Sequence, residues 1–142
     1  MKDALLTICV PTYNRYMMLN KCLSALSNIQ AQNNYFNLVI GDNGSMDKTQ
    51  DVIAKWKPKF ENVTVITHPK NIEFDRNVAS LFAEVDTEYC WLLGDCDTIS
   101  VQNYSKIEQH LKDGYDAVVI NTDEGLFDKQ KTIYTNITDF LN

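Results

Sequence analysis

The 142-residue chain lacks several features that would place it in a common functional class. It has no basic surplus, because 13 Lys and Arg residues face 19 Asp and Glu residues and the formal net charge is −6. A nucleic-acid partner requires a basic face that neutralises phosphates, so the charge balance argues against such a partner. An anionic substrate would need a metal ion or locally placed Arg and Lys side chains.

Long hydrophobic runs and a secretory signal are also missing. No apolar stretch approaches the roughly 20 residues that span a bilayer, and residues 1–4 lead directly into a short apolar segment. We therefore expect a cytoplasmic protein. It would meet a membrane only peripherally, at the cytoplasmic face, or through chain beyond Asn142.

The four cysteines show neither a C-x-x-C pair nor the spacing of a zinc site. Cys9 and Cys90 lie in apolar segments with strand character, and Cys22 lies on the apolar side of a predicted helix. We interpret these three as small hydrophobic core residues in a reducing compartment, and we assign no chemistry to Cys96.

Glycine-rich phosphate-binding motifs are missing as well. The loop after the first predicted strand contains neither G-x-G-x-x-G nor G-x-x-x-x-G-K-[ST]. The usual dinucleotide-binding and P-loop sites are therefore not indicated.

Strand-like and helix-like segments alternate through most of the chain. Predicted strands occupy residues 5–10, 37–40, 63–67, 88–93 and 117–120, and Pro11 is expected to stop the first. The predicted helices between them have apolar faces made of Leu19, Cys22, Leu23, Leu26 and Ile29; Val52, Ile53, Trp56 and Phe60; Phe74, Val78, Leu81, Phe82 and Val85; and Tyr104, Ile107 and Leu111. This alternation predicts an α/β fold with a doubly wound, mostly parallel sheet, in one domain of residues 1–142.

Polar segments follow the first, second and fourth predicted strands, at residues 11–15, 42–47 and 95–97. Carboxyl ends of parallel strands lie at one edge of a sheet, where ligands bind, so we expect these segments to converge. Asp42 ends the second strand and could accept from a nucleobase N–H or a ribose hydroxyl, or be only a turn residue. Ser45 or Asp47 could cap the helix that follows.

The fourth predicted strand is expected to be buried and central, and it ends in Gly94 before Asp95 and Asp97. Two carboxylates this close repel each other unless a cation compensates their charge. Hard oxygen ligands of this kind suit Mg²⁺ or Mn²⁺, which usually bridge to substrate phosphates. An acidic loop without a ligand is the alternative interpretation of the D-x-D pattern.

Four segments, in order, resemble the family 2 glycosyltransferases. They are residues 10–15 (VPTYNR), 41–49 (GDNGSMDKT), 71–77 (NIEFDRN) and 95–97 (DCD), and the resemblance covers about residues 5–120. Residues 71–77 depart from the family at Glu73 and Asp75, which replace a glycine and a small residue. The resemblance implies the GT-A fold and inverting transfer of a sugar from a nucleoside diphosphate sugar to a glycan or lipid-linked acceptor hydroxyl, as in cell-surface polysaccharide biosynthesis.

The resemblance also implies roles for the matching residues in donor binding. Pro11, Thr12 and Tyr13 would border the nucleoside. Asp42 would hydrogen-bond the base, usually uracil, and Arg76 would lie near the base or the diphosphate.

The same resemblance implies roles for the D-x-D loop. Asp95 would contact the ribose or the donor sugar, and Asp97 would ligate Mn²⁺ or Mg²⁺, with Asp95 as the second candidate ligand. Arg15 could reach the donor, but we interpret it as a solvated loop charge.

Inversion requires a carboxylate that takes the acceptor proton, and the resemblance implies a base well C-terminal to the D-x-D loop. The carboxylates of Asp123, Glu124 and Asp128 come too early by that spacing. We therefore expect the donor-binding part of a longer enzyme, with its base beyond Asn142, and no sugar transfer by residues 1–142 without it.

Two other functions compete with this interpretation. Phosphotransferases of the haloacid dehalogenase type also carry a D-x-D loop, but theirs follows the first core strand and continues with glycine and threonine. Here Thr98 and Ile99 follow the motif. A non-catalytic nucleotide-sugar-binding module fits the sequence as well as the donor-binding part of an enzyme does.

Overall fold

The computed structural model describes residues 4–118 and 120. In chain order the elements are β1 (Leu6–Thr12), α1 (Tyr16–Gln30), β2 (Asn37–Asp42), α2 (Thr49–Trp56), the 3-10 helix η1 (Lys57–Lys59), β3 (Val63–Thr67), α3 (Phe74–Phe82), β4 (Tyr89–Leu92) and α4 (Val101–Lys112). Of the strand predicted at 117–120, the described residues Ala117, Val118 and Ile120 lie in no strand. Residue 119 and the three carboxylates at 123, 124 and 128 lie outside the described residues.

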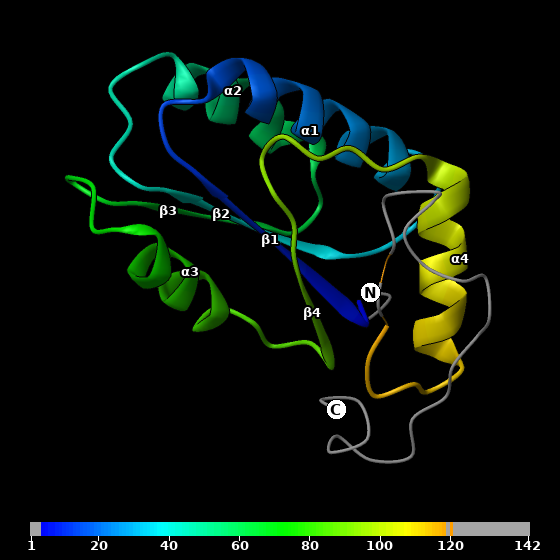
Figure 1. Cartoon of the computed structure of the whole chain (residues 1–142). Coiled ribbons are helices and arrows are strands. Elements are labelled where there is room, and N and C mark those ends of the chain that lie inside the picture. Colours follow the sequence, from blue (N-terminus) through cyan, green and yellow to red (C-terminus); the bar gives the residue numbers. More distant parts are fainter. Residues whose placement is uncertain (1–3, 119, 121–142) are drawn as a thin grey trace, which may run out of the picture.

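The strands form one parallel sheet in the order β3-β2-β1-β4. The helices α1, α2 and α4 pack on one face of this sheet and α3 packs on the other (Figure 1). Helices on both faces of a parallel sheet are the predicted doubly wound α/β arrangement, so that prediction is confirmed.

The core lies mainly between β1, β2 and the three helices of the first face. The predicted apolar faces of α1 and α4 are buried in full, which confirms both. Phe60 is buried too, but it follows η1 and does not lie on α2. Within the described residues, no helix combines the length and the apolar character that crossing a membrane requires.

Pro11 does not stop the first strand, because β1 continues through it to Thr12. The carbonyl of Cys9 accepts from Leu93 N on the β4 side, at 2.9 Å. Pro11, two residues further on, faces the same side, where β4 has already ended at Leu92. Its missing N–H therefore costs no ladder hydrogen bond, which is the condition under which proline is tolerated in a strand.

The prediction that the fourth strand is central and buried is wrong. In the described sheet β4 lies at an edge, and half-buried Tyr89 and Trp91 alternate with exposed Cys90 and Leu92. Cys90 is therefore not a core residue, whereas Cys9 and Cys22 are buried as predicted. Burial raises the pKa of the Cys9 and Cys22 thiols to about 12, so both are inert near neutral pH.

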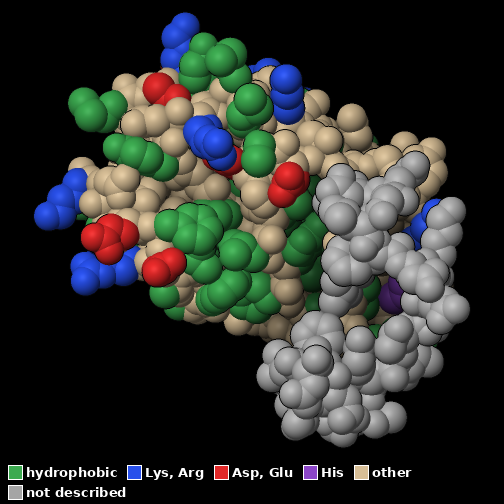
Figure 2. Space-filling view, in the orientation of Figure 1, with side chains coloured by type: hydrophobic (Ala, Val, Ile, Leu, Met, Phe, Trp, Pro, Cys, Tyr) green, Lys and Arg blue, Asp and Glu red, His purple; other side chains and the backbone are tan. Residues whose placement is uncertain are grey.

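The predicted apolar face of α3 is only partly buried. Phe74 is 61% exposed and Phe82 is 46% exposed, and Figure 2 shows hydrophobic side chains gathered on the surface over α3. The centre of the buried side is held by Leu81 and Asn77. Asn77 takes this position because its Nδ2 donates to the carbonyl of Gly41 in β2, at 3.0 Å.

Candidate functional site

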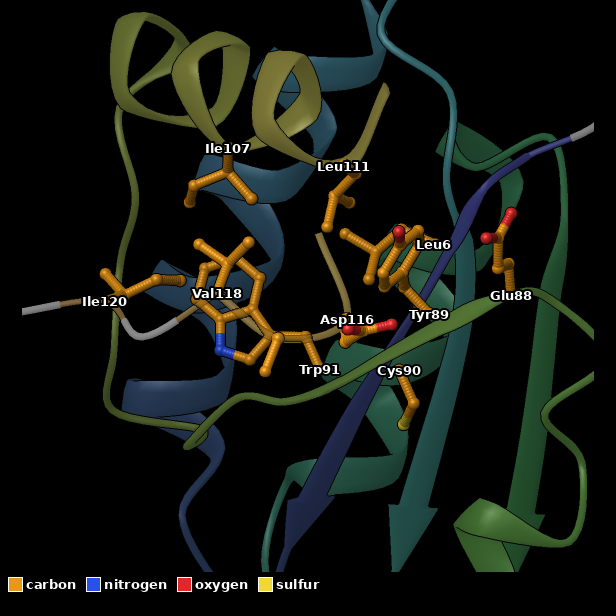
Figure 3. Close-up of a pocket in the computed structure, with 11 residues that line it drawn as sticks. Leu6, Glu88, Tyr89, Cys90, Trp91, Ile107, Leu111, Asp116, Val118 and Ile120 are labelled. Atoms are coloured by element: carbon orange, nitrogen blue, oxygen red, sulfur yellow. The ribbon is translucent and has the colours of Figure 1, made fainter. Parts of the chain in front are cut away.

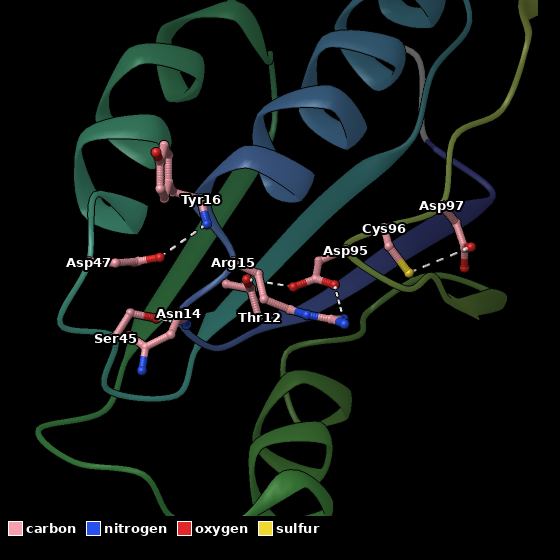
Figure 4. Close-up of polar contacts among 9 residues, drawn as sticks. All are labelled: Thr12, Asn14, Arg15, Tyr16, Ser45, Asp47, Asp95, Cys96 and Asp97. Carbon is pink, nitrogen blue, oxygen red and sulfur yellow. Dashed lines mark hydrogen bonds and ion pairs between the residues drawn. The ribbon is translucent and has the colours of Figure 1, made fainter.

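The polar loops after β1, β2 and β4 meet at the carboxyl edge of the sheet, as predicted (Figure 4). Asn14 N donates to Ser45 Oγ at 2.8 Å, and Met46 N donates to Asn14 Oδ1 at 2.7 Å. Thr12 Oγ1 donates to Asp95 Oδ2 at 2.8 Å. Segments that are 31 to 83 residues apart in the chain therefore form one hydrogen-bonded site.

Asp95 is buried at the centre of this junction. Besides the bond from Thr12, its Oδ1 accepts from Arg15 Nη1 at 3.0 Å, and the Asp95 charge raises the pKa of the Arg15 guanidinium. Arg15 is therefore not a free loop charge, although its side chain remains 57% exposed. The pair was missed because its members are 80 residues apart and no local pattern links them.

Asp97 lies on the other side of Cys96 and turns away from Asp95 (Figure 4). Its N–H donates to the carbonyl of Gly94 at 3.0 Å, which closes a tight turn. A Cβ at Gly94 would lie 2.7 Å from Asp97 Oδ2, so a larger residue there would have to displace the Asp97 side chain. The Asp97 side chain is exposed, as is that of Cys96.

The described residues contain no group of three or more His, Cys, Asp and Glu side chains that could enclose a metal ion. Asp97 nevertheless fits a site of the kind in which Mg²⁺ or Mn²⁺ takes one or two protein carboxylates and completes its shell with substrate phosphates. Asp95 fits less well, because Thr12 and Arg15 already donate to its two oxygens. Of the two acids in the D-x-D loop, Asp97 is thus the one whose carboxylate is exposed and is not bonded by Thr12 or Arg15.

Asp42 is fully buried, and both of its carboxylate oxygens are occupied. Oδ1 accepts from Ser45 N at 3.0 Å, within the turn that follows β2. Oδ2 accepts from the side-chain amide of Gln50, whose Nε2 also lies 3.3 Å from Thr67 Oγ1. The predicted base-reading residue is thus covered by Gln50, a residue that the motif comparison did not single out.

Asp47 accepts hydrogen bonds from the amino ends of two helices, α1 and α2. Its Oδ1 accepts from Thr49 N at 2.9 Å, and its Oδ2 accepts from Tyr16 N at 3.2 Å. Partial burial raises the pKa of Asp47, but the hydrogen bonds from Thr49 and Tyr16 outweigh burial and hold that pKa below its ordinary value. The N-cap position of α2 is Lys48, but Asp47 just before it accepts from Thr49, the first residue of α2, and also from the first residue of α1. Ser45 bonds to Asn14 instead.

The turn before α3 is fastened to the loop after β2 by Asn43. Asn43 Oδ1 accepts from Ile72 N at 2.8 Å, and its Nδ2 donates to the carbonyl of Glu73 at 3.2 Å. Glu73 itself has φ 75 and ψ 160, a combination that is almost confined to glycine. Glutamate in place of the glycine of the family pattern therefore leaves the backbone at this position strained.

Replacing Glu73 by glycine is expected to stabilise the protein by about 1 kcal/mol, because it removes backbone strain of roughly 1–3 kcal/mol and adds a smaller entropy cost. Urea unfolding of the variant and the wild type measures the difference. Glu61→Gly is the matched control, because Glu61 is exposed and has no positive φ. Equal destabilisation by both substitutions would contradict the strain at Glu73.

The remaining predicted residues lie around the same edge with different exposures. Pro11 and Thr12 are buried in β1, and Tyr13 beside them is 40% exposed. Arg76 is exposed in the first turn of α3. Among the described residues, the cation that pairs with Asp95 is Arg15 and not Arg76.

A hollow lies between β4 and α4 (Figure 3). It has a volume of about 380 Å³ and is lined mainly by apolar side chains, among them Leu6, Trp91, Ile107 and Leu111. Leu6 and Tyr89 are the first residues of β1 and β4, so the hollow includes the amino ends of these strands. It is separate from the edge at which parallel sheets bind ligands.

Comparison with known proteins identifies a family and several relatives. The family described as Glycosyl transferase family 2 matches residues 7–136. Abequosyltransferase RfbV of Salmonella typhimurium is 28% identical to this chain over 109 residues, which are 75% of this chain and 32% of that protein.

Two solved structures have the same fold at low identity. The crystal structure of S. aureus TarS 1-349 in complex with UDP matches with a TM-score of 0.68 and 19% identity, over 76% of this chain and 32% of that chain. The mannosyltransferase PcManGT from Pyrobaculum calidifontis, in complex with GDP-Man and Mn²⁺, matches with a TM-score of 0.65 and 17% identity, over 80% of this chain and 34% of that chain. The present chain thus spans about a third of the length of each of these proteins.

Proposed function

The chain belongs to glycosyl transferase family 2, and from this premise we propose that it is the nucleotide-sugar-binding domain of a longer enzyme. That enzyme transfers a sugar from a nucleoside diphosphate sugar to an acceptor hydroxyl. The observation that carries the proposal is the junction of three loops around Asp95 at the carboxyl edge of the sheet. The UDP and GDP-Man complexes of the two structural neighbours support the donor class.

The hydrogen bonds of the Asp42 carboxylate support uridine as the nucleoside. Asp42 Oδ1 is bound by Ser45 N within the turn. Only Asp42 Oδ2, which now accepts from the Gln50 side chain, can therefore accept a hydrogen bond from a ligand instead. Uracil presents one N–H between two carbonyl groups and needs one acceptor. Guanine presents an N–H and an amino group side by side and would use both carboxylate oxygens. Pro11, Thr12 and Tyr13 would border the base.

The D-x-D loop would serve the sugar and the diphosphate. Asp97 would hold Mn²⁺ or Mg²⁺, which when bound offsets the negative charge that develops on the departing diphosphate. Asp95, fixed by Thr12, would accept from a hydroxyl of the ribose or donor sugar. Arg15 and Arg76 carry exposed cationic groups at this edge and would face the diphosphate.

We propose that transfer proceeds with inversion and that the general base comes from outside the described residues. The edge carboxylates Asp42, Asp95 and Asp97 already have donor-side roles in this scheme. The name of the abequosyltransferase relative supports transfer of a sugar. We propose in addition a glycan or lipid-linked acceptor and a role in cell-surface polysaccharide synthesis, in the cytoplasm or at the cytoplasmic face of the membrane. The alternative, a non-catalytic nucleotide-sugar-binding module, predicts the same donor binding. It differs in one respect, because the longer protein would then form no glycosylated product.

The structure and the family do not support the alternative phosphotransferase function. Its D-x-D loop follows the first core strand, whereas the loop here follows β4 and the chain belongs to another family.

Calorimetric titration with UDP and GDP tests the proposed donor class. With Mn²⁺ present, UDP is expected to bind about 10-fold more tightly than GDP, because the second guanine donor lacks an acceptor at Asp42. UMP serves as the comparison that isolates the contribution of the second phosphate. No binding of any of the three nucleotides to the folded protein would refute the donor site.

A further inference from the structure

Gln50 lies at the carboxyl edge of the sheet and has no role of its own in the proposed function. It is the second residue of α2, and its side chain reaches back over the last residues of β2 and β3, Asp42 and Thr67. Its Nε2 donates to Asp42 Oδ2 and lies 3.3 Å from Thr67 Oγ1. The same amide therefore bridges the ends of two neighbouring strands.

The oxygen that Gln50 covers is the one that a ligand would need. Asp42 has no exposed surface, and its other oxygen is bound by Ser45 N inside the turn. A base N–H that donates to Asp42 must therefore take the place of the Gln50 amide. Gln50 is exposed, so its side chain can rotate away without movement of α2.

We infer that Gln50 is an internal substitute for the nucleobase: it satisfies the Asp42 carboxylate in the free protein and is displaced when a uridine nucleotide binds. This inference rests on the proposed role of Asp42. A buried carboxylate with only one hydrogen bond is costly, so the free protein needs a second donor at Oδ2. Thr67 Oγ1 lies within reach of the same Nε2 and accepts from it after displacement.

The substitute lowers the affinity for the nucleotide. Binding breaks the bond between Gln50 and Asp42, so the apparent affinity equals the intrinsic affinity multiplied by the fraction of molecules in which Asp42 is uncovered. Only a base that donates to Oδ2 repays this loss. A base without an N–H at that position leaves Gln50 in place or leaves the carboxylate unpaired.

The test is the dissociation constant of UDP for the wild type, Gln50→Ala and the control Gln102→Ala, measured with Mn²⁺ present. Gln102 is also an exposed glutamine at the second position of a helix, α4. Gln50→Ala is expected to bind UDP about tenfold more tightly than the wild type, and Gln102→Ala to bind it equally. In the Asp42→Asn background the gain from Gln50→Ala should disappear, since the charged acceptor is gone.

Thermal unfolding gives a second readout on the same proteins. Without nucleotide, Gln50→Ala should unfold at a lower temperature than the wild type, and saturating UDP should raise its midpoint by more. If UDP binds the wild type but binds Gln50→Ala equally or more weakly, Gln50 is not a substitute for the base, and the proposed donor site still stands. If UDP binds neither folded protein, both the donor site and the role of Gln50 are refuted.

Discussion

Replacing Asp42 by asparagine is expected to weaken UDP binding by about 10- to 100-fold, which corresponds to the loss of a hydrogen bond to a charged group. Asparagine keeps the shape of the side chain and an oxygen for Ser45 N, so the turn after β2 is preserved. Its amide group then faces the base N–H, and two donors cannot bond to each other. Calorimetric titration of both proteins with UDP measures the difference.

The control for this substitution is Asp51→Asn. Asp51 is exposed in the first turn of α2, so the substitution makes the same charge change close to the site without touching Asp42. Asp51→Asn should bind UDP with an affinity within about twofold of the wild type, because exposed charges are screened by salt. Equal affinities of the wild type and Asp42→Asn would remove Asp42 from the nucleotide site.

Replacing Asp97 by asparagine is expected to abolish the metal dependence of UDP binding. In the wild type, Mn²⁺ should tighten UDP binding by about 5- to 150-fold, and UDP should tighten Mn²⁺ binding by the same factor, because coupling is reciprocal. Asp97 is exposed, so its substitution should leave the free energy of unfolding within about 0.5 kcal/mol of the wild type.

The measurement is a set of UDP titrations with and without Mn²⁺ on the wild type, Asp97→Asn and Asp51→Asn. Asp51→Asn should retain the full metal effect. A wild type whose UDP affinity does not respond to Mn²⁺ would exclude the proposed metal site. A metal effect that survives in Asp97→Asn would place the ligand on another residue, with Asp95 as the next candidate.

Local periodicity was sufficient to predict most of the fold. The buried face of α1 repeats every three to four residues, as in Leu19, Leu23 and Leu26, and such a pattern depends on nothing beyond the helix itself. The convergence of the loops could also be predicted, because the topology of a parallel sheet brings strand ends to one edge. For this reason the joining of Thr12 and Asp95, across 83 residues, follows from the order of the strands.

The failures share a different physical cause. Phe74, Phe82 and Cys90 are as apolar as residues of the core, but whether they are buried depends on which strands α3 covers. In the structure α3 packs on β1 and β2, and β4 is left at the edge. The coverage of a face is a property of the assembled layers, which no single segment encodes.

The same limit applies within the candidate site. The motifs identified Asp42 and Asp95, but they did not indicate that Gln50 donates to Asp42 or that Arg15 pairs with Asp95. These contacts depend on side-chain directions at the ends of three different elements. They decide which carboxylate oxygens remain for a ligand, and so they change the chemical role that each acid can have.

The central claim is that the three loops at the carboxyl edge together bind a nucleoside diphosphate. Amide chemical shifts of the isotope-labelled chain, recorded during titration with UDP and Mg²⁺, test it most directly. We expect the largest shifts in residues 12–15, 42–50 and 94–97, with the side-chain amide of Gln50 among them. Shifts confined to the hollow between β4 and α4, or no shifts at saturating UDP, would contradict the account.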